Sequence, residues 1–386
     1  MKRLAIVITH PIQYYAPLFR LMTERQRIGV RVFYTWDDAS ITRHDPGFGK
    51  IITWDVDLLS GYDYQSLKNT AVKPGSHHFN GVINPDIIEQ INAFKPDAVL
   101  AFSWAYNAHL TTLRHFKGKI PVFFRADSNL LDQRNIFKRV ARSLWLTWVY
   151  RHIDHAFYTG INNRAYFKKY GLKDAQLSFA PHAVDNDWFS KNRLHEAALL
   201  KKQMDIPETD TVILFAGKME DKKHPTLLLN AFLKLNKPLT HLLFVGDGHL
   251  KDHLKTLAGA SPNVHFLDFQ NQSYMPVVYQ ACNLFCLPSQ GPGETWGLAV
   301  NEAMACGKAI LVSDKVGCAA DLVQPGKNGM IFKSDNEADL LNCLDKLTAS
   351  KDLLLSYGRE SANIIKPWCF ENIVKAIENR MIDARP

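Results

Sequence analysis

The sequence predicts an α/β protein with two doubly wound parallel sheets. Its 386 residues are enough for two domains of ordinary size, each with its own core. Short apolar runs alternate with helical patterns along the whole chain, which is typical of strands buried on both faces. The same alternation restarts after residue 210. We therefore expect a first domain over residues 1–190, a second over 191–370, and a final helix, 371–386, that returns to the first.

Composition indicates a globular protein, because 46% of the residues are hydrophobic and 22% are charged. No apolar run approaches the about 20 residues of a spanning helix, and the first apolar run predicts a strand rather than a signal peptide. The six cysteines lack CxxC spacing, so we expect reduced thiols in a cytoplasmic protein and no metal site. The net charge of +8 suits anionic partners such as nucleotide phosphates or lipid head groups, or serves solubility alone.

In the first half, Asp, Gly and Pro without periodicity predict a loop over Thr35–Lys50. Helices are predicted from near Ala16-Pro17 and over Ile83–Phe94. Strands are predicted at Leu4–Thr9, Val30–Tyr34, Ala98–Phe102, Val122–Phe124, Ala156–Thr159 and Leu177–Ala180.

A helix predicted over Asn135–His152 mixes basic and aromatic residues. The basic residues are Lys138, Arg139, Arg142 and Arg151, with Arg134 just before the helix, and the large apolar ones are Phe137, Leu144, Trp145, Leu146 and Trp148. This mixture suits the surface of an anionic membrane. The alternative is a core-facing helix with a solvated basic edge, which is favoured because buried aromatic residues at helical spacing are common.

The second half has the more regular pattern. Helices are predicted at Pro225–Leu235, Met275–Cys282, Glu337–Leu347 and Glu371–Met381. Strands are predicted at Val212–Ala216, His241–Val245, Val264–Leu267, Leu284–Leu287, Ala309–Val312 and Gly329–Phe332. Doubly wound sheets bind ligands beyond the carboxyl ends of their strands, so the loops that follow these strands are candidate binding sites.

Two of these loops are glycine-rich. Gly217 follows the first strand of the second half, and Lys218 and Lys223 in the same loop are suited to reach a diphosphate as point charges. Gly246-Asp247-Gly248 either forms a simple strand-to-helix turn or places its backbone against a ligand.

The most informative stretch is Leu287–Val323, in which Glu294 lies in a glycine-rich loop and Glu302 lies in the following helix. The N-terminus of a helix offers unpaired N–H groups to a phosphate. A carboxylate on each side of that loop is suited to accept hydrogen bonds from hydroxyl groups. Phosphates flanked by two polyols describe a nucleotide-sugar.

At this point the sequence resembles the retaining glycosyltransferases of family 4, which have the GT-B architecture of two Rossmann-like domains facing across a cleft. The resemblance rests on four segments, FAGKMEDKKHPTLLLNAF, FVGDGHL, LPSQGPGETWGLAVNEAMACGKAILVSD and PHAVDNDWF. They run through nearly all of the C-terminal half. In the N-terminal half the resemblance lies in the alternation of strands and helices more than in motifs, although HPIQYYAPLFR and WDVDLLSGYDY look like one branch of the family.

The resemblance implies a role for several residues. Lys223 matches the lysine that binds the donor diphosphate, and Lys218 stands where an arginine is usual. Glu294 matches the carboxylate that faces the sugar, and Glu302 matches the ligand of the ribose hydroxyls. The backbone N–H groups of Gly297 and Leu298 match those on the phosphates.

The N-terminal half departs from the family pattern. Its first loop holds His10 and Gln13 instead of a glycine-rich turn, and Asp127 lies where a histidine is common. We hypothesise that His10 and Gln13 contact the acceptor or the phosphate. Asp127 either faces the reacting groups or serves as an N-cap or partner of Arg125. Trp104 either stacks on a sugar or belongs to the core.

These residues predict an enzyme that transfers a hexosyl group from a nucleoside-diphosphate sugar to a glycan or lipid-linked hydroxyl. The family implies retention of configuration, no metal, and a place in cell-surface polysaccharide or glycolipid assembly. No cofactor and no nucleic-acid partner are expected, because the donor is itself a substrate and no nucleic-acid module is present. The alternatives are a non-catalytic protein that binds membrane or glycan, and a nucleotide-sugar epimerase or a phosphorylase of the same architecture.

Overall fold

The computed structural model describes residues 1–36, 42–45, 50–131 and 136–383, with the backbone alone for 42–45, 50–52 and 136–139. Contacts divide the chain into two compact units. The first comprises Met1–Ile41, Asp57–His182 and Phe370–Pro386, and the second comprises Thr42–Val56 and Ala183–Cys369. In the described residues, no helix is both long and apolar enough to cross a membrane.

The first unit is built on a seven-stranded parallel sheet in the order β5-β2-β1-β6-β7-β8-β9. Five of its strands carry runs of buried residues, as expected for a sheet covered on both faces. The strands are β1 (Arg3–Ile8), β2 (Gly29–Tyr34), β5 (Asp63–Ser66), β6 (Ala98–Phe102), β7 (Val122–Arg125), β8 (His155–Tyr158) and β9 (Leu177–Phe179).

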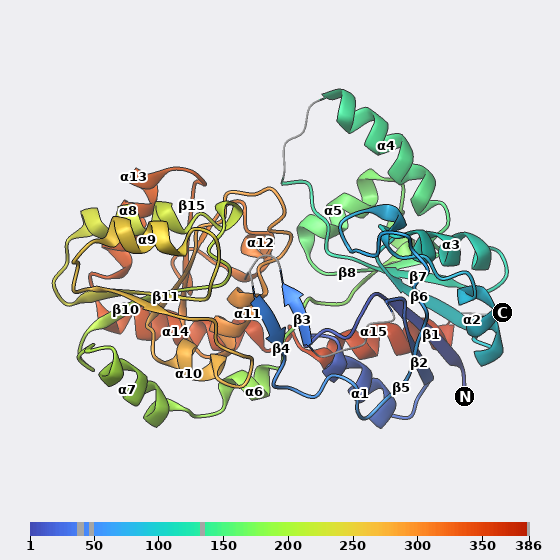
Figure 1. Ribbon diagram of the computed structural model, residues 1–386, viewed down its shortest axis with the longest axis horizontal. Coiled ribbons are helices and arrows are strands. Elements are labelled where there is room, and N and C mark those ends of the chain that lie inside the picture. Colours follow the sequence, from blue (N-terminus) through green and yellow to red (C-terminus); the bar gives the residue numbers. More distant parts are fainter. Residues whose placement is uncertain (37–41, 46–49, 132–135, 384–386) are drawn as a thin grey trace. The chain divides into compact units, whose positions relative to one another are not determined.

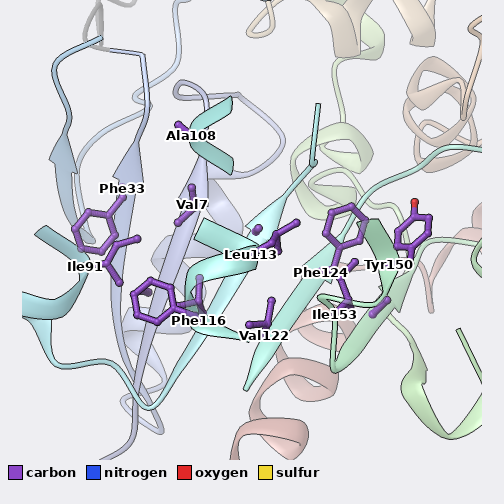
Figure 2. Close-up of a cluster of buried hydrophobic side chains, with 14 of the residues drawn as sticks. Val7, Phe33, Ile91, Ala108, Leu113, Phe116, Val122, Phe124, Tyr150 and Ile153 are labelled. Atoms are coloured by element: carbon purple, nitrogen blue, oxygen red, sulfur yellow. The ribbon is translucent and has the colours of Figure 1, made fainter. Parts of the chain in front are cut away.

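Helices cover both faces of this sheet (Figure 1). On one face, side chains such as Val7, Phe33 and Phe124 pack against Leu113, Phe116 and Tyr150 from the helices (Figure 2). The helices of the unit are α1 (Ala16–Glu24), α2 (Ile87–Phe94), α3 (Asn107–Phe116), α4 (Ile136–Tyr150), α5 (Ile161–Lys169) and α15 (Phe370–Asp383), with the short η1 (Phe79–Gly81) and η2 (Asp174–Gln176).

The second unit is built on a six-stranded parallel sheet in the order β12-β11-β10-β13-β14-β15. Its strands are β10 (Thr211–Ala216), β11 (Thr240–Val245), β12 (Val264–Leu267), β13 (Leu284–Leu287), β14 (Ala309–Ser313) and β15 (Gly329–Phe332). Its helices are α6 (Asn186–Ser190), α7 (Leu194–Gln203), η3 (Asp221–Lys223), α8 (Pro225–Leu235), α9 (Lys251–Ala258), α10 (Met275–Gln280), α11 (Leu298–Ala305), α12 (Ala319–Leu322), α13 (Glu337–Leu347) and α14 (Lys351–Ile365). The strand order reverses between β10 and β13, and a doubly wound sheet binds its ligand at this point.

The predicted fold class of two doubly wound α/β domains is confirmed by these sheets. The predicted loop over Thr35–Lys50 is wrong in part, because β3 (Thr42–Asp45) and the start of β4 (Lys50–Thr53) fall within it and pair in an antiparallel ribbon. These strands lie outside both large sheets, so no buried apolar run marks them in the sequence.

Helix α14 has no counterpart among the predicted helices. Its buried positions include Gly358 and Ser361 beside Leu354 and Ile365, so its apolar periodicity is weak. The small residue at position 358 is required by packing, since a Cβ there would lie 2.1 Å from the carbonyl oxygen of Gly307.

The last helix, α15, is tied to α1 within the first unit. The Arg25 guanidinium donates to both carboxylate oxygens of Glu378, each at 2.9 Å, and Glu378 is fully buried. Lys2 adds a hydrogen bond to the carbonyl oxygen of Met381 at 2.9 Å. The end of the chain is thus built into the unit that contains its beginning.

Candidate functional site

The loops that follow β10 and β11 lie against each other because both contain glycine at a positive φ. A Cβ at Gly246, where φ is +133°, would lie 2.1 Å from the carbonyl oxygen of Gly217, and one at Gly248 would lie 2.4 Å from that of Met219. The Met219 N–H donates to the carbonyl oxygen of Asp247 at 2.9 Å. Side chains at these positions would push the two loops apart.

Lys223 and Glu294 meet at this edge of the sheet. The Lys223 Nζ donates to Glu294 Oε2 at 2.6 Å, and the Ser289 hydroxyl donates to the same oxygen at 2.9 Å. Burial by itself would raise the pKa of Glu294, but the Lys223 ammonium and the Ser289 hydroxyl outweigh burial and lower this pKa. An ionised carboxylate and an ammonium group are therefore held together after the two strands that flank the reversal of strand order.

The loop that carries Glu294 leads directly into α11. Gly297, with φ at +95°, precedes the helix, and a Cβ there would lie 2.9 Å from Val316 Cγ1. The loop is held by backbone bonds from Gly317 to the carbonyl oxygen of Glu294 at 3.2 Å and from Cys318 to that of Trp296 at 2.9 Å. No side chain caps the helix, so its first N–H groups, which include Leu298, are suited to an anion.

Glu302 lies in the middle of α11 and is 4% exposed. Its Oε2 accepts from the Tyr279 hydroxyl at 2.6 Å, and its Oε1 accepts from Gln272 Nε2 at 3.2 Å. These two hydrogen bonds fix the orientation of the carboxylate. Sequence reasoning missed Tyr279 and Gln272, which precede Glu302 by 23 and 30 residues.

The carboxylate of Asp247 is directed into the protein. It accepts from Lys251 Nζ at 2.6 Å and from the Phe269 backbone N–H at 3.1 Å. Asp247 therefore positions the loop that follows β12. Lys218, in the loop after β10, is half-buried.

The remaining predicted residues belong to the first unit. His10 Nδ1 lies 2.9 Å from the Thr9 hydroxyl, and the carboxylate of Asp127 lies 3.9 Å from His182 Nε2. Burial, together with the charge of Arg125, outweighs Asp127 and lowers the pKa of His182 to about 4, so this imidazole is neutral. His182 was not singled out, although it lies in the quoted segment PHAVDNDWF, because nothing in that segment indicates contact with Asp127, 55 residues earlier.

Arg125 is fully buried, and burial lowers its pKa, while the charge of nearby Asp127 acts in the opposite direction. Its guanidinium donates to the carbonyl oxygens of Ala180 and Pro181, each at 2.8 Å. Trp104 packs against the core of the first unit and contacts Trp145 with ring centroids 6.5 Å apart, while Gln13 lies half-buried just before α1. Among the described residues, no group of three or more His, Cys, Asp or Glu side chains is arranged to hold a metal ion.

Comparison with solved structures identifies the fold. Solved structures with the same fold over nearly the whole chain include Anabaena HepE in complex with UDP and glucose, which has a TM-score of 0.73 at 16% identity and covers 99% of this chain and 100% of that one. WaaG, a glycosyltransferase involved in lipopolysaccharide biosynthesis, has a TM-score of 0.68 at 14% identity over 98% and 100% of the two chains. The protein thus has the two Rossmann-like domains of the GT-B fold.

The second unit also matches a protein family by sequence. Residues 197–363 match the model of the family described as Glycosyl transferases group 1. D-inositol 3-phosphate glycosyltransferase of Gordonia bronchialis is 27% identical over 54% of this chain and 47% of its own length. Sulfoquinovosyl transferase SQD2 of Arabidopsis thaliana is 27% identical over 73% and 54%. The chain therefore spans about half the length of these relatives.

Proposed function

We propose that the protein is a glycosyltransferase that moves a sugar from a nucleoside-diphosphate sugar to an acceptor hydroxyl. The observation that carries this proposal is the Lys223–Glu294 pair, 2.6 Å apart, in which Glu294 lies three residues before Gly297 at the N-terminus of α11, where no side chain caps the helix. The pair and the helix supply a cation, a hydroxyl-binding carboxylate and anion-binding N–H groups within one loop system. The match of residues 197–363 to group 1 glycosyl transferases supports the same assignment.

In the proposed reaction, the bond between the anomeric carbon and the terminal phosphate oxygen breaks. Lys218, Lys223 and the N–H groups of Gly297 and Leu298 stabilise the charge on the leaving diphosphate. The acceptor oxygen bonds to the anomeric carbon on the same face, and its proton passes to the departing phosphate. This route gives retention and uses no enzyme nucleophile, metal or cofactor. Glu294 holds sugar hydroxyls and Glu302 holds the ribose.

The acceptor side is proposed to lie in the first unit, around His10, Gln13 and Asp127. Asp127 is the residue proposed to face the reacting groups, because it is more exposed than its neighbour His182, with 39% of its side chain exposed. A glycan or lipid-linked acceptor in polysaccharide or glycolipid assembly is supported by a relative named lipopolysaccharide 1,2-N-acetylglucosaminetransferase, which is 26% identical over 54% of this chain. Cytoplasmic activity at the surface of an anionic membrane is part of the same proposal.

The test is a panel of UDP-, GDP- and ADP-sugars assayed for thermal stabilisation of the protein and for sugar transfer. At least one donor should raise the melting temperature. Glu294→Gln keeps the size of the side chain and should lower transfer at least 100-fold, because the carboxylate both faces the sugar and pairs with Lys223. Unchanged transfer in this variant would remove Glu294 from the catalytic residues.

Two further readouts address the alternatives. The anomeric configuration of the product, followed by NMR from the first turnover, tests retention, and activity after chelation tests metal independence. An epimerase would release free nucleotide without an acceptor, and a non-catalytic protein would bind a donor or glycan without turnover. Either result would replace the proposed reaction by that alternative.

A further inference from the structure

A short segment from the N-terminal half of the sequence forms part of the second unit. Residues 53–56, here called the 53–56 segment, pack on the loop that follows β12. Asn271 Nδ2 donates to the carbonyl oxygen of Thr53 at 2.6 Å, and the carboxylate of Asp55 accepts from the Ser273 N–H at 3.2 Å and from the Ser273 hydroxyl. These bonds join residues that are 218 positions apart.

The same contact brings two aromatic rings together. The half-buried rings of Trp54 and Phe269 meet edge to face, with centroids 6.4 Å apart and an angle of 71° between the ring planes. The Phe269 backbone is fixed by Asp247, and the neighbouring loop residues are fixed by the 53–56 segment. The Trp54 and Phe269 rings therefore form a pair at the edge of the β12 loop.

This loop is also connected to the ribose side of the proposed donor site. Gln272 lies between Asn271 and Ser273, which hold the 53–56 segment, and its side chain donates to Glu302. Glu302 lies five residues after Gly297, and a rise of about 1.5 Å per residue places it roughly 7.5 Å along the helix axis. This separation suits a ribose whose phosphates lie at Gly297.

The order of these groups follows the order of a nucleotide. The helix N-terminus is suited to the phosphates, Glu302 to the ribose, and the β12 loop, which contacts Glu302 through Gln272, comes next. A nucleobase offers a flat π-face, and aromatic side chains stack on any base.

We propose that Trp54, together with Phe269, forms the wall of the nucleobase site, and that Asp55 positions the β12 loop for it. The inference rests on the proposed function and deepens it, because it names the part of the chain that contacts the base. Part of the donor site is then supplied by a segment that lies outside the residues matched to the glycosyl transferase family, 197–363.

The test uses calorimetric binding of UDP, GDP, ADP and inorganic pyrophosphate to the full chain. Trp54→Ala should lower the affinity for the nucleoside diphosphate that wild type binds by roughly 5- to 100-fold, because one stacking contact is lost. Pyrophosphate, which has no base, should bind equally well to both. Trp54→Phe keeps an aromatic face and should recover most of the affinity.

Trp188→Ala is the matched control, since Trp188 is a half-buried tryptophan on α6 of the second unit, and its ring contacts Lys191 just after that helix. It should leave both affinities unchanged. Asp55→Asn should lower the affinity for the nucleotide less than Trp54→Ala does. Because Asp55 is proposed only to position the loop, this variant should raise the donor KM without lowering kcat.

The possible failures are distinguishable. If wild type binds none of the three nucleotides, the proposed function fails. If wild type binds one of them and Trp54→Ala binds it equally well, the nucleobase wall is overturned and the proposed function stands. Equal losses for nucleotide and pyrophosphate, or an equal loss in Trp188→Ala, would also overturn the wall, because they indicate general damage to the unit.

Discussion

At the scale of single residues, the candidate site depends on the backbone as much as on its charged groups. Lys223 and Glu294 come from loops 71 residues apart, and their approach to 2.6 Å requires that the strands before them lie side by side in the sheet. Glycine in the neighbouring loops permits the close packing. The chemistry of the side chains was predictable from their types, but their pairing with each other follows from the strand order.

Gly246→Ala should both destabilise the protein and weaken donor binding. Its new Cβ would lie 2.1 Å from the Gly217 carbonyl oxygen, so the two loops must separate. Gly326→Ala is the control, because Gly326 also has a positive φ, +81°, but faces open space. Backbone strain should lower the free energy of unfolding of the control by only about 1–2 kcal/mol, and the control should bind the donor normally. Equal behaviour of the two variants in denaturant melts and binding titrations would contradict this packing argument.

His109 should make the protein less stable in acid. It is fully buried beside the Thr35 hydroxyl and the Ser103 carbonyl oxygen, and burial lowers its pKa from 6.5 to about 4. Between these pH values only the unfolded chain takes up the proton, so the free energy of unfolding falls as pH falls from 6.5 to 4. The loss from this one group should reach roughly 3 kcal/mol.

Denaturant unfolding at pH 7.0, 5.5 and 4.5 measures this dependence. His109→Gln lacks the titrating ring and should lose less stability over the same interval. The wild type also contains His155, His182 and His265, whose pKa values burial lowers to about 4, so the variant should keep part of the slope. A slope identical to that of wild type would show that His109 does not remain neutral.

At the scale of elements, α4 presents apolar side chains to solvent. Leu144 is 71% exposed and Trp145 is 43% exposed, while Leu146, Val149 and Tyr150 are buried. The sequence between Gln133 and Ile153 holds no acidic residue. One face of the helix therefore lies in the core, as expected of a core-facing helix, while the exposed side carries apolar residues in addition to the basic ones. Contact with a membrane stays a prediction. The side chains of Arg134, Phe137, Lys138 and Arg139 lie outside the described residues.

Leu144→Glu should weaken binding to vesicles that contain anionic phospholipid. The change removes an apolar contact and adds a charge that the membrane repels. Leu355→Glu on α14 is the control, because Leu355 is also exposed, at 56%, and belongs to the second unit. Cosedimentation with anionic and neutral vesicles at low and high salt measures the effect. No binding by wild type, or equal binding by both variants, would contradict membrane contact through α4.

At the scale of the whole molecule, the chain crosses between the two units more than once. The segment Thr42–Val56 belongs to the second unit, and the final helix returns to the first. The return is fixed by Glu378, which is fully buried against Arg25. Neither unit is therefore a continuous piece of sequence.

Glu378→Gln should destabilise the first unit by about 3 kcal/mol, because it leaves the Arg25 guanidinium without its buried counter-charge. Glu371→Gln is the control, since Glu371 is 55% exposed and lies 3.7 Å from the same arginine. An exposed pair of this kind contributes less than about 1 kcal/mol. Equal midpoints for the two variants in urea unfolding would show that the buried pair does not hold α15.

The sequence by itself determined the two parallel sheets, because buried strands such as Ala98–Phe102 and Leu284–Leu287 are short apolar runs bounded by turns. It also singled out the glycine-rich loops and their carboxylates. Only the tertiary structure decided that Asp247 supports the β12 loop, that Tyr279 and Gln272 orient Glu302, and that the 53–56 segment joins the second unit. The physical reason is that local periodicity records which face of an element is buried. Hydrogen bonds between residues 22 to 218 positions apart form only when the sheet has brought those residues together.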